Sequence, residues 1–66
     1  MSVAKIIEIS SDSKISFQDA IEAGLKRAEQ TLKNVKGAWI AEQKVSVNKG
    51  KISSYRVIMR VSFIID

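Results

Sequence analysis

Residues 52–65 read ISSYRVIMRVSFII, and this stretch decides the fold class. From residue 55 onward, apolar side chains occupy every second position, while arginines, serines and isoleucines share the positions between them. A period of two is typical of a β-strand that buries one of its faces. The odd-numbered positions supply the apolar face, which comprises Tyr55, Val57, Met59, Val61, Phe63 and Ile65.

A turn and a second strand precede this stretch. Residues 48–51 read NKGK, and a glycine at such a place is typical of a β-hairpin turn. Residues 38–48 are therefore predicted to form the strand that pairs with residues 52–65.

The preceding segment has the pattern of one amphipathic helix. Over residues 17–34 the apolar side chains recur three or four apart. Ser16 is a good N-cap, with Asp19 three residues later in the manner of a capping box. Gly24 lies on the apolar stripe, which predicts a close approach to a strand. Gly37 is expected to end the helix in the left-handed conformation.

The N-terminal segment completes a β-α-β-β order. Residues 3–10 are rich in β-branched side chains and predict a first strand, and residues 10–14 are expected to be a polar loop. The chain is therefore predicted to be a single domain over residues 1–66. Its fold class is α+β, with a three-stranded antiparallel sheet wrapped around one helix.

The second face of this sheet predicts self-association. An open sheet with isoleucines on its outer face would leave apolar surface and strand edges uncovered. Scattered surface isoleucines are the alternative, because single exposed apolar residues are common. The residues concerned are Ile40, Ile52, Ile58 and Ile64.

Composition narrows the range of functions. The 66 residues include no cysteine and no histidine, so thiolate metal sites and the commonest general base are both excluded. The carboxylates are dispersed, and serine has no base partner, so the chain is not expected to be an enzyme. Met1–Lys5 holds no signal-like apolar run and no segment is long enough to span a membrane, which favours the cytoplasm.

Basic residues outnumber acidic ones by 11 to 7, which favours anionic partners. Arg56 and Arg60 lie four apart on one face of the last strand, either as an anion-binding strip or as a solvated face. The lysines near the turn are better explained as a solvated edge. No groove-reading motif is present, so nucleic acid is a disfavoured partner.

Trp39 is the only tryptophan, and it lies early in the second strand. By parity it falls with Ala41, Gln43, Val45 and Val47. Its side chain either fills the core or lies at a subunit interface, where it would stack on a ligand or seal the contact. A β-bulge near Gly37 would invert this parity argument.

Nearly the whole chain resembles the dodecin family. The resemblance is carried by VAKIIEI at residues 3–9, SF at 16–17 with AI at 20–21, RAEQTLKNV at 27–35 and YRVIMRVSF at 55–63. It implies a homododecamer that forms a hollow sphere and, in many members, binds flavins between subunits.

The flavin site of the family is altered in this chain. Flavin-binding dodecins stack a tryptophan on the ring early in the second strand, and a glutamine after the third-strand tyrosine binds the polar edge of the ring. The matching positions are Gly37 and Arg56, so Trp39 lies two residues late. In these features the chain is similar to the group described as calcium dodecins.

Two functions are therefore expected. In the first, a dodecamer stores a flavin of the FMN or riboflavin type, or a similar flat anionic ligand, with Gly37, Trp39 and Arg56 at the ligand. In the second, Trp39 and Arg56 close the pocket of a flavin-free shell that binds calcium or another ion, and Glu42 is a candidate metal ligand.

Overall fold

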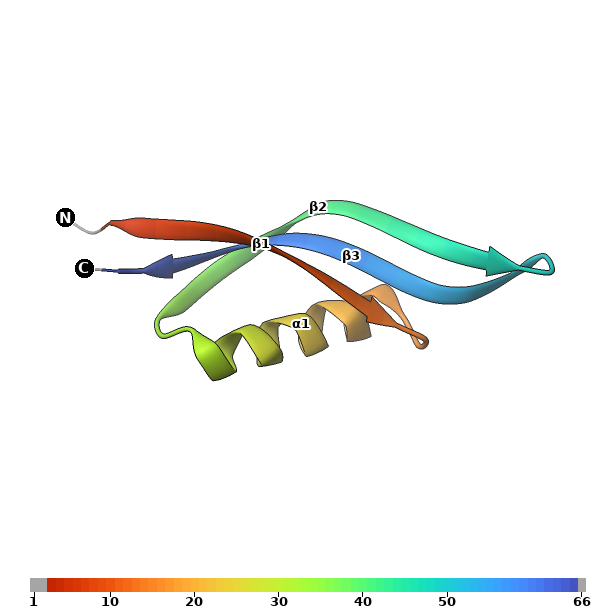
Figure 1. Cartoon of the computed structure of the whole chain (residues 1–66), viewed down its shortest axis with the longest axis horizontal. Helices are drawn as coiled ribbons and strands as arrows, with labels where there is room; N and C mark the ends of the chain where they lie inside the picture. The colour runs from red at the N-terminus through yellow and green to blue at the C-terminus, as the bar shows by residue number, and fades with distance from the viewer. Residues whose placement is uncertain (1–2, 66) are drawn as a thin grey trace.

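A computed structural model describes residues 3–65, so Met1 and Ser2 of the N-terminal stretch considered above lie outside it. The elements follow the predicted order, with β1 at Ala4–Ser13, α1 at Phe17–Thr31, β2 at Val35–Asn48 and β3 at Lys51–Ile64. The three strands form one layer, and α1 lies against one side of it (Figure 1). The predicted α+β fold with a three-stranded antiparallel sheet and one helix is thus confirmed.

The strand order is β1-β3-β2, so the strand with the clearest sequence pattern lies in the centre of the sheet. Both neighbours pair with it antiparallel. A central strand has neighbours on both edges and a helix on one face. This explains why every second side chain along β3 is apolar. The outer edges of β1 and β2 have no strand partner among the described residues.

The core lies between β3 and α1. Val57, Met59 and Val61 of β3 are fully buried, and they pack with Ala20 of the helix. Small residues line the helix face that meets the sheet. Gly24 allows the closest approach, because a Cβ atom there would lie 2.6 Å from Met59 Cε and 3.0 Å from Ser11 Cβ. The predicted reason for this glycine is confirmed.

The start of α1 was predicted correctly, but its acidic partner behaves differently. Ser16 is the N-cap, and its hydroxyl accepts a hydrogen bond from the backbone N–H of Asp19 at 3.0 Å. The Asp19 carboxylate does not complete a capping box, because it accepts from the buried Ser13 hydroxyl at 2.6 Å. Ser13 in turn accepts from the backbone N–H groups of Ile15 and Ser16 and so fixes the turn into the helix.

The end of α1 differs from the prediction. The helix stops at Thr31, and Asn34 takes the left-handed conformation with φ of 62°. Asparagine tolerates this region better than most residues. Gly37, which was expected to end the helix, lies instead within β2.

The first strand is longer than predicted, since β1 continues through the serine-rich residues 10–13 that were expected to form a loop. Serine and aspartate have low strand propensity, but pairing with the central strand outweighs it here. Asp12 lies opposite Arg56, and Ser13 lies opposite Tyr55.

A β-bulge in β2 reverses the predicted parity of its first half. Ile40 pairs with Met59 and Glu42 pairs with Ile58, so Ala41 is an extra residue. Ile40, predicted to lie on the outer face, therefore packs against the core. Trp39 lies on the opposite face to Gln43, although the two share odd parity.

The β2–β3 hairpin projects beyond α1 and the end of β1 (Figure 1). Val47 and Ile52 pair within this projecting part and are 63% and 52% exposed. Lys49 and Gly50 form its tip, both with positive φ, as predicted for a hairpin turn. No helix of the described residues is long and apolar enough to cross a membrane.

Candidate functional site

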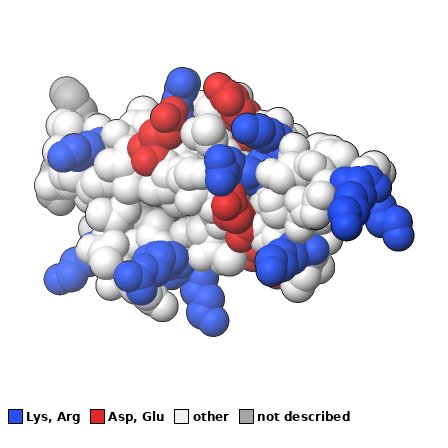
Figure 2. Space-filling model, turned by 45° about the vertical axis from the view of Figure 1, so that its right-hand side comes forward, with Lys and Arg blue, Asp and Glu red and all other residues white. Residues whose placement is uncertain are grey.

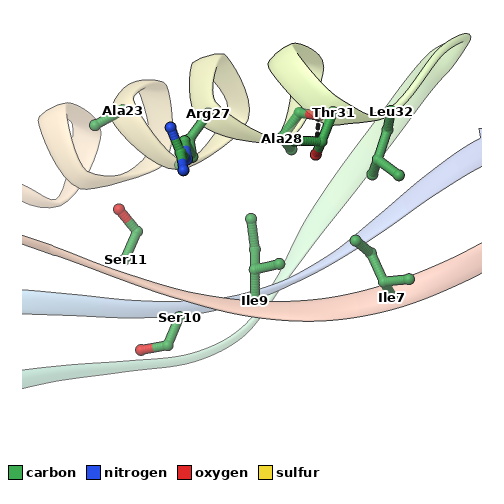
Figure 3. Close-up of a pocket in the computed structure, with 10 residues that line it drawn as sticks. Ile7, Ile9, Ser10, Ser11, Ala23, Arg27, Ala28, Thr31 and Leu32 are labelled. Carbon is green, nitrogen blue, oxygen red and sulfur yellow. Dashed lines mark hydrogen bonds between the residues drawn. The ribbon is translucent and has the colours of Figure 1, made fainter.

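The predicted ligand residues share the face of the sheet that points away from α1, here called the outer face, but they are spread along it. Ser10 illustrates its direction, because its side chain lies across the strand from the helix while Ile9 and Ser11 point toward the helix (Figure 3). The register of the strands assigns the remaining members of this face. They are Ile6, Glu8, Ser10 and Asp12 from β1, Gly37, Trp39, Glu42 and Lys44 from β2, and Arg56, Ile58, Arg60 and Ser62 from β3.

These side chains form cross-strand rows. One row runs from Glu8 through Arg60 to Trp39, and another runs from Asp12 through Arg56 to Lys44. Side chains directly opposite each other in a sheet have Cβ atoms about 5 Å apart, so neighbours within a row are in contact range. Each row therefore places an arginine between an acid on β1 and, on β2, a tryptophan or a lysine.

Each arginine is bound by the acid of its row. Arg56 pairs side-on with Asp12, donating from Nε to Oδ1 at 2.8 Å and from Nη2 to Oδ2 at 3.1 Å. Arg60 makes one contact with Glu8, from Nε to Oε2 at 3.3 Å. Two hydrogen bonds in one plane fix both position and orientation, so Arg56 is the better ordered of the two.

The ion pair shifts the pKa of both of its members. The hydrogen bond from Arg56 lowers the pKa of Asp12 below its usual value of 3.8, and the same bond raises the pKa of Arg56. Both side chains remain about half exposed, at 50% and 47%. Asp12 is thus ionised at neutral pH and remains reachable from the outer face.

Trp39 lies beside Arg60 rather than beside Arg56. Arg60 is its direct partner on β3, and Arg56 lies four residues further along that strand. At the rise of a β-strand this separation is about 13 Å. The sequence paired Trp39 with Arg56 as ligand residues, whereas within one chain the cation directly opposite Trp39 is Arg60.

Gly37 lies still further from Arg56. It pairs with Ser62, whose hydroxyl donates to the Gly37 carbonyl at 3.2 Å. Six residues of β3 separate Ser62 from Arg56, or about 20 Å. A ring stacked at Gly37 and a polar group bound by Arg56 therefore lie at opposite ends of the outer face of one protomer.

Glu42, the candidate metal ligand, also lies on the outer face, opposite Ile58. Its cross-strand neighbour is apolar, so no second carboxylate stands directly opposite it. Within the part of the chain that the structure describes, no three acidic side chains are grouped closely enough to hold a metal ion. One protomer therefore offers Glu42 as a single oxygen ligand.

Charges of both signs are interspersed over the middle of the molecule in the view of Figure 2. Basic side chains gather at the end that carries the β2–β3 hairpin. This end holds Lys49 and Lys51 around the turn. Further basic side chains gather on the lower side of this view, away from the hairpin, so positive charge is spread over the molecule, while Arg56 and Arg60 of the outer face are paired with acids.

A separate groove lies between α1 and the edge strand β1, with a volume of about 360 Å³. Ile7 and Ile9 line it from the strand, and Arg27, Ala28 and Leu32 line it from the helix and the residue after it (Figure 3). None of the residues predicted to bind ligand lies in this groove. It is a gap beside the unpaired edge of β1, distinct from the outer face.

The chain is similar to known proteins along its whole length. The family model described as Dodecin matches residues 3–66. The chain belongs to the dodecin family. It is 32% identical over 63 residues to the calcium dodecin of Mycobacterium tuberculosis, a match that covers 96% of this chain and 89% of that protein.

Solved dodecin structures share the fold. A point variant of the dodecin of Thermus thermophilus superposes with a TM-score of 0.94 at 26% identity, covering 100% of this chain and 98% of that one. The dodecin of Streptomyces davaonensis gives 0.92 at 31% identity, covering 98% and 96%. A crystal structure of the M. tuberculosis calcium dodecin, described as having a novel calcium-binding site, gives 0.84 at 33% identity and covers 98% and 93%.

Sequence reasoning missed the two acids of β1. Asp12 was placed in a loop, and Glu8 was treated as one of several dispersed carboxylates. Their spacing of four residues matches the spacing of Arg56 and Arg60, which is the signal that two antiparallel strands would pair them.

Proposed function

We propose that this dodecin is a homo-oligomeric binding and storage protein that holds a flavin of the FMN or riboflavin type between subunits. The observation that carries the proposal is the position of Trp39. The indole lies on the outer face, 45% exposed in the protomer, next to a cation and away from the helix-side core. Stacking on a flat ring is the chemistry that such an exposed indole offers.

The spacing of the site supports a ligand shared by two copies. Trp39 and Arg56 lie about 13 Å apart along β3. A second protomer facing the first across the outer faces would bring the Arg56 region of one copy toward Trp39 of the other. Pairing of copies also suits a small domain, since a chain of this length buries little apolar surface by itself.

The small size of the core is consistent with a need for association. Its fully buried large side chains are Val57, Met59 and Val61. Ile6 and Trp39 of the outer face stay about half exposed. Association through the outer face would bury both residues, so assembly and ligand storage use one surface.

A fluorescence titration tests the proposal. FMN or riboflavin is mixed with the purified oligomer, and we expect flavin emission to be quenched at micromolar protein through contact with Trp39. Emission that stays unchanged over that range would contradict a flavin function.

Calcium binding is a second candidate, favoured by one observation. Glu42 lies on the same outer face as Trp39, and the relative at 32% identity is named a calcium dodecin. Because Glu42 stands alone in its protomer, a site for calcium would draw further oxygen ligands from another copy.

Isothermal titration calorimetry separates the two candidates. Calcium added to flavin-free protein should release or absorb heat and raise the melting temperature if the second candidate holds. The variant Glu42→Gln should abolish both signals. Absence of heat and of thermal stabilisation in the native protein would exclude calcium.

A further inference from the structure

The Asp12–Arg56 pair has the hydrogen-bonding character of an amide. A guanidinium has five N–H donors and no acceptor. Two of the five, on Nε and Nη2, are committed to Asp12, which leaves three donors on the terminal nitrogens. The carboxylate keeps lone pairs free on both of its oxygens. Together the two side chains present donors and acceptors side by side.

Within the pair the two charges cancel, and Lys44, the next member of the same row, adds a positive charge beside it. Asp12, which is ionised at neutral pH, compensates the charge of Arg56 through two short contacts. An uncompensated arginine at this position would favour phosphate or carboxylate groups. The compensated guanidinium directs its free donors to neutral groups such as carbonyl oxygens, while an anionic group such as a phosphate tail would be attracted by Lys44 of the same row.

The pair is oriented before any ligand arrives. Asp12 and Arg56 are direct partners in the antiparallel register, and the side-on contact holds the guanidinium plane to the carboxylate plane. Ligand binding therefore loses little side-chain entropy at this arginine. The half-exposed state of both side chains leaves their remaining groups open on the outer face.

These properties match one edge of a flavin ring. That edge carries the N3–H donor between two carbonyl acceptors, and it is neutral. A partner for it must supply an acceptor flanked by donors. We propose that Asp12 is a specificity residue of the outer face, and that its carboxylate accepts from the ring N3–H while Arg56 donates to an adjacent carbonyl.

This inference rests on the proposed flavin function and deepens it. The pair replaces the glutamine that flavin-binding dodecins carry at the position of Arg56, because an amide also combines donor and acceptor without net charge. The arginine alone could not do so, since it accepts no hydrogen bond. Asp12 is what makes Arg56 a substitute for an amide rather than an anion site.

The experiment pairs a change in the ligand with a change in the protein. Lumiflavin and 3-methyllumiflavin differ only in the N3–H group, and neither carries a charged tail. Dissociation constants for both are measured by flavin fluorescence quenching with the native oligomer. We expect methylation to weaken binding about tenfold or more, as loss of a hydrogen bond to a charged acceptor predicts.

Variants assign this loss to Asp12. In Asp12→Ala the ratio of the two constants should fall below about threefold, because the acceptor is gone and the methyl group gains space. Glu22→Gln is the matched control, since it removes an exposed carboxylate of α1, away from the outer face, and should keep the native ratio. The double variant Asp12→Ala/Arg56→Gln should restore the ratio, because the new amide supplies both functions.

The outcomes are distinct. A ratio near one in the native protein overturns the inference without any variant, and so does a native ratio that persists in Asp12→Ala. Recovery in the double variant supports recognition over a purely structural role, because a structural defect would not be repaired by glutamine. If the native protein quenches neither flavin, the proposed function itself fails.

Discussion

Trp39 on β2 is the direct cross-strand partner of Arg60 on β3. The same arginine contacts Glu8 on its other side at 3.3 Å. This arrangement depends on one extra residue, because the bulge at Ala41 turns residues 37–40 over relative to the rest of β2. With a regular strand, Trp39 would share the helix-side face with Gln43 and Val45. The bulge thus decides that the tryptophan of this chain lies on the outer face.

Trp39 is predicted to provide the stacking surface for flavin. Trp39→Phe keeps a flat ring and should bind FMN within about threefold of the native protein, whereas Trp39→Ala should weaken binding about tenfold. The measurement is a quenching titration at constant oligomer concentration. Stacking contributes about 0.5–1.5 kcal/mol beyond burial, and the loss of buried area adds to it.

Tyr55 supplies the control for this prediction. It lies on the helix side and packs edge-on against Phe17, with ring centroids 5.1 Å apart. Tyr55→Phe changes an aromatic residue without touching the outer face, so FMN affinity should stay at the native value. Equal weakening by Tyr55→Phe and Trp39→Ala would show that quenching reports general packing and not stacking at Trp39.

The sequence was sufficient for the elements whose signals are local. The alternation over β3 follows from burial of one strand face, and Ser16 marks the helix start through its own hydrogen bond. The hairpin turn follows from the φ preference of Gly50. These features depend on neighbours within a few residues, so a pattern in the chain is enough to predict them.

The features that position the site are not local. The bulge at Ala41 carries no glycine or proline, so nothing in β2 alone predicts it. The extension of β1 through Asp12 depends on pairing with Arg56, which lies 44 residues away in the chain. Sequence reasoning therefore assigned Arg56 to the site and left out the carboxylate that binds it.

Gly24 is predicted to be essential for packing of α1 on the sheet. In Gly24→Ala the new Cβ would lie 2.6 Å from Met59 Cε and 3.0 Å from Ser11 Cβ. The Met59 methyl group ends a flexible side chain and can shift, but Ser11 Cβ is fixed to the backbone of β1 and cannot give way without moving the strand. Overpacking costs about 1–3 kcal/mol and exceeds the gain of about 1 kcal/mol in helix propensity. Urea denaturation should show a net loss of stability.

Gly37→Ala is the matched control for this change. The nearest atom to a Cβ there is Ser62 Oγ at 3.6 Å, which is an ordinary contact. The strand gains in backbone entropy, so the free energy of unfolding should change by less than about 1 kcal/mol. Should both glycine variants lose stability equally, the close approach of Gly24 to the sheet would not be the cause.

Asp12 is predicted to contribute to stability in a pH-dependent way. Its pKa in the folded protein lies below its usual value of 3.8 because Arg56 donates a hydrogen bond to the ionised form. A lowered pKa means that the contribution is fully present above pH 3.8 and is lost as the pH falls through the folded value. The melting temperature of the native protein should therefore exceed that of Asp12→Asn at pH 6–7.

The difference between the two proteins is the quantity to follow as the pH is lowered. It should stay constant from neutral pH to about pH 5 and shrink below about pH 4. Subtracting the variant removes the titration of the other carboxylates. A difference that is independent of pH down to pH 2 would mean that the pair does not depend on the charge of Asp12.

Assembly is predicted to depend on the apolar part of the outer face. Ile6 lies on this face opposite Ser62 and is 53% exposed in the protomer. Ile6→Lys would place an unpaired charge where a second copy is expected to pack, and burying such a charge is strongly unfavourable. The variant should elute from gel filtration as a smaller species than the native protein.

Ile15→Lys makes the same chemical change in the turn before α1, at a residue that is 75% exposed, and should keep the native elution volume. If Ile6→Lys also elutes at the native volume, the copies do not associate through the outer face, and a ligand shared between Trp39 of one copy and Arg56 of another would lose its structural basis.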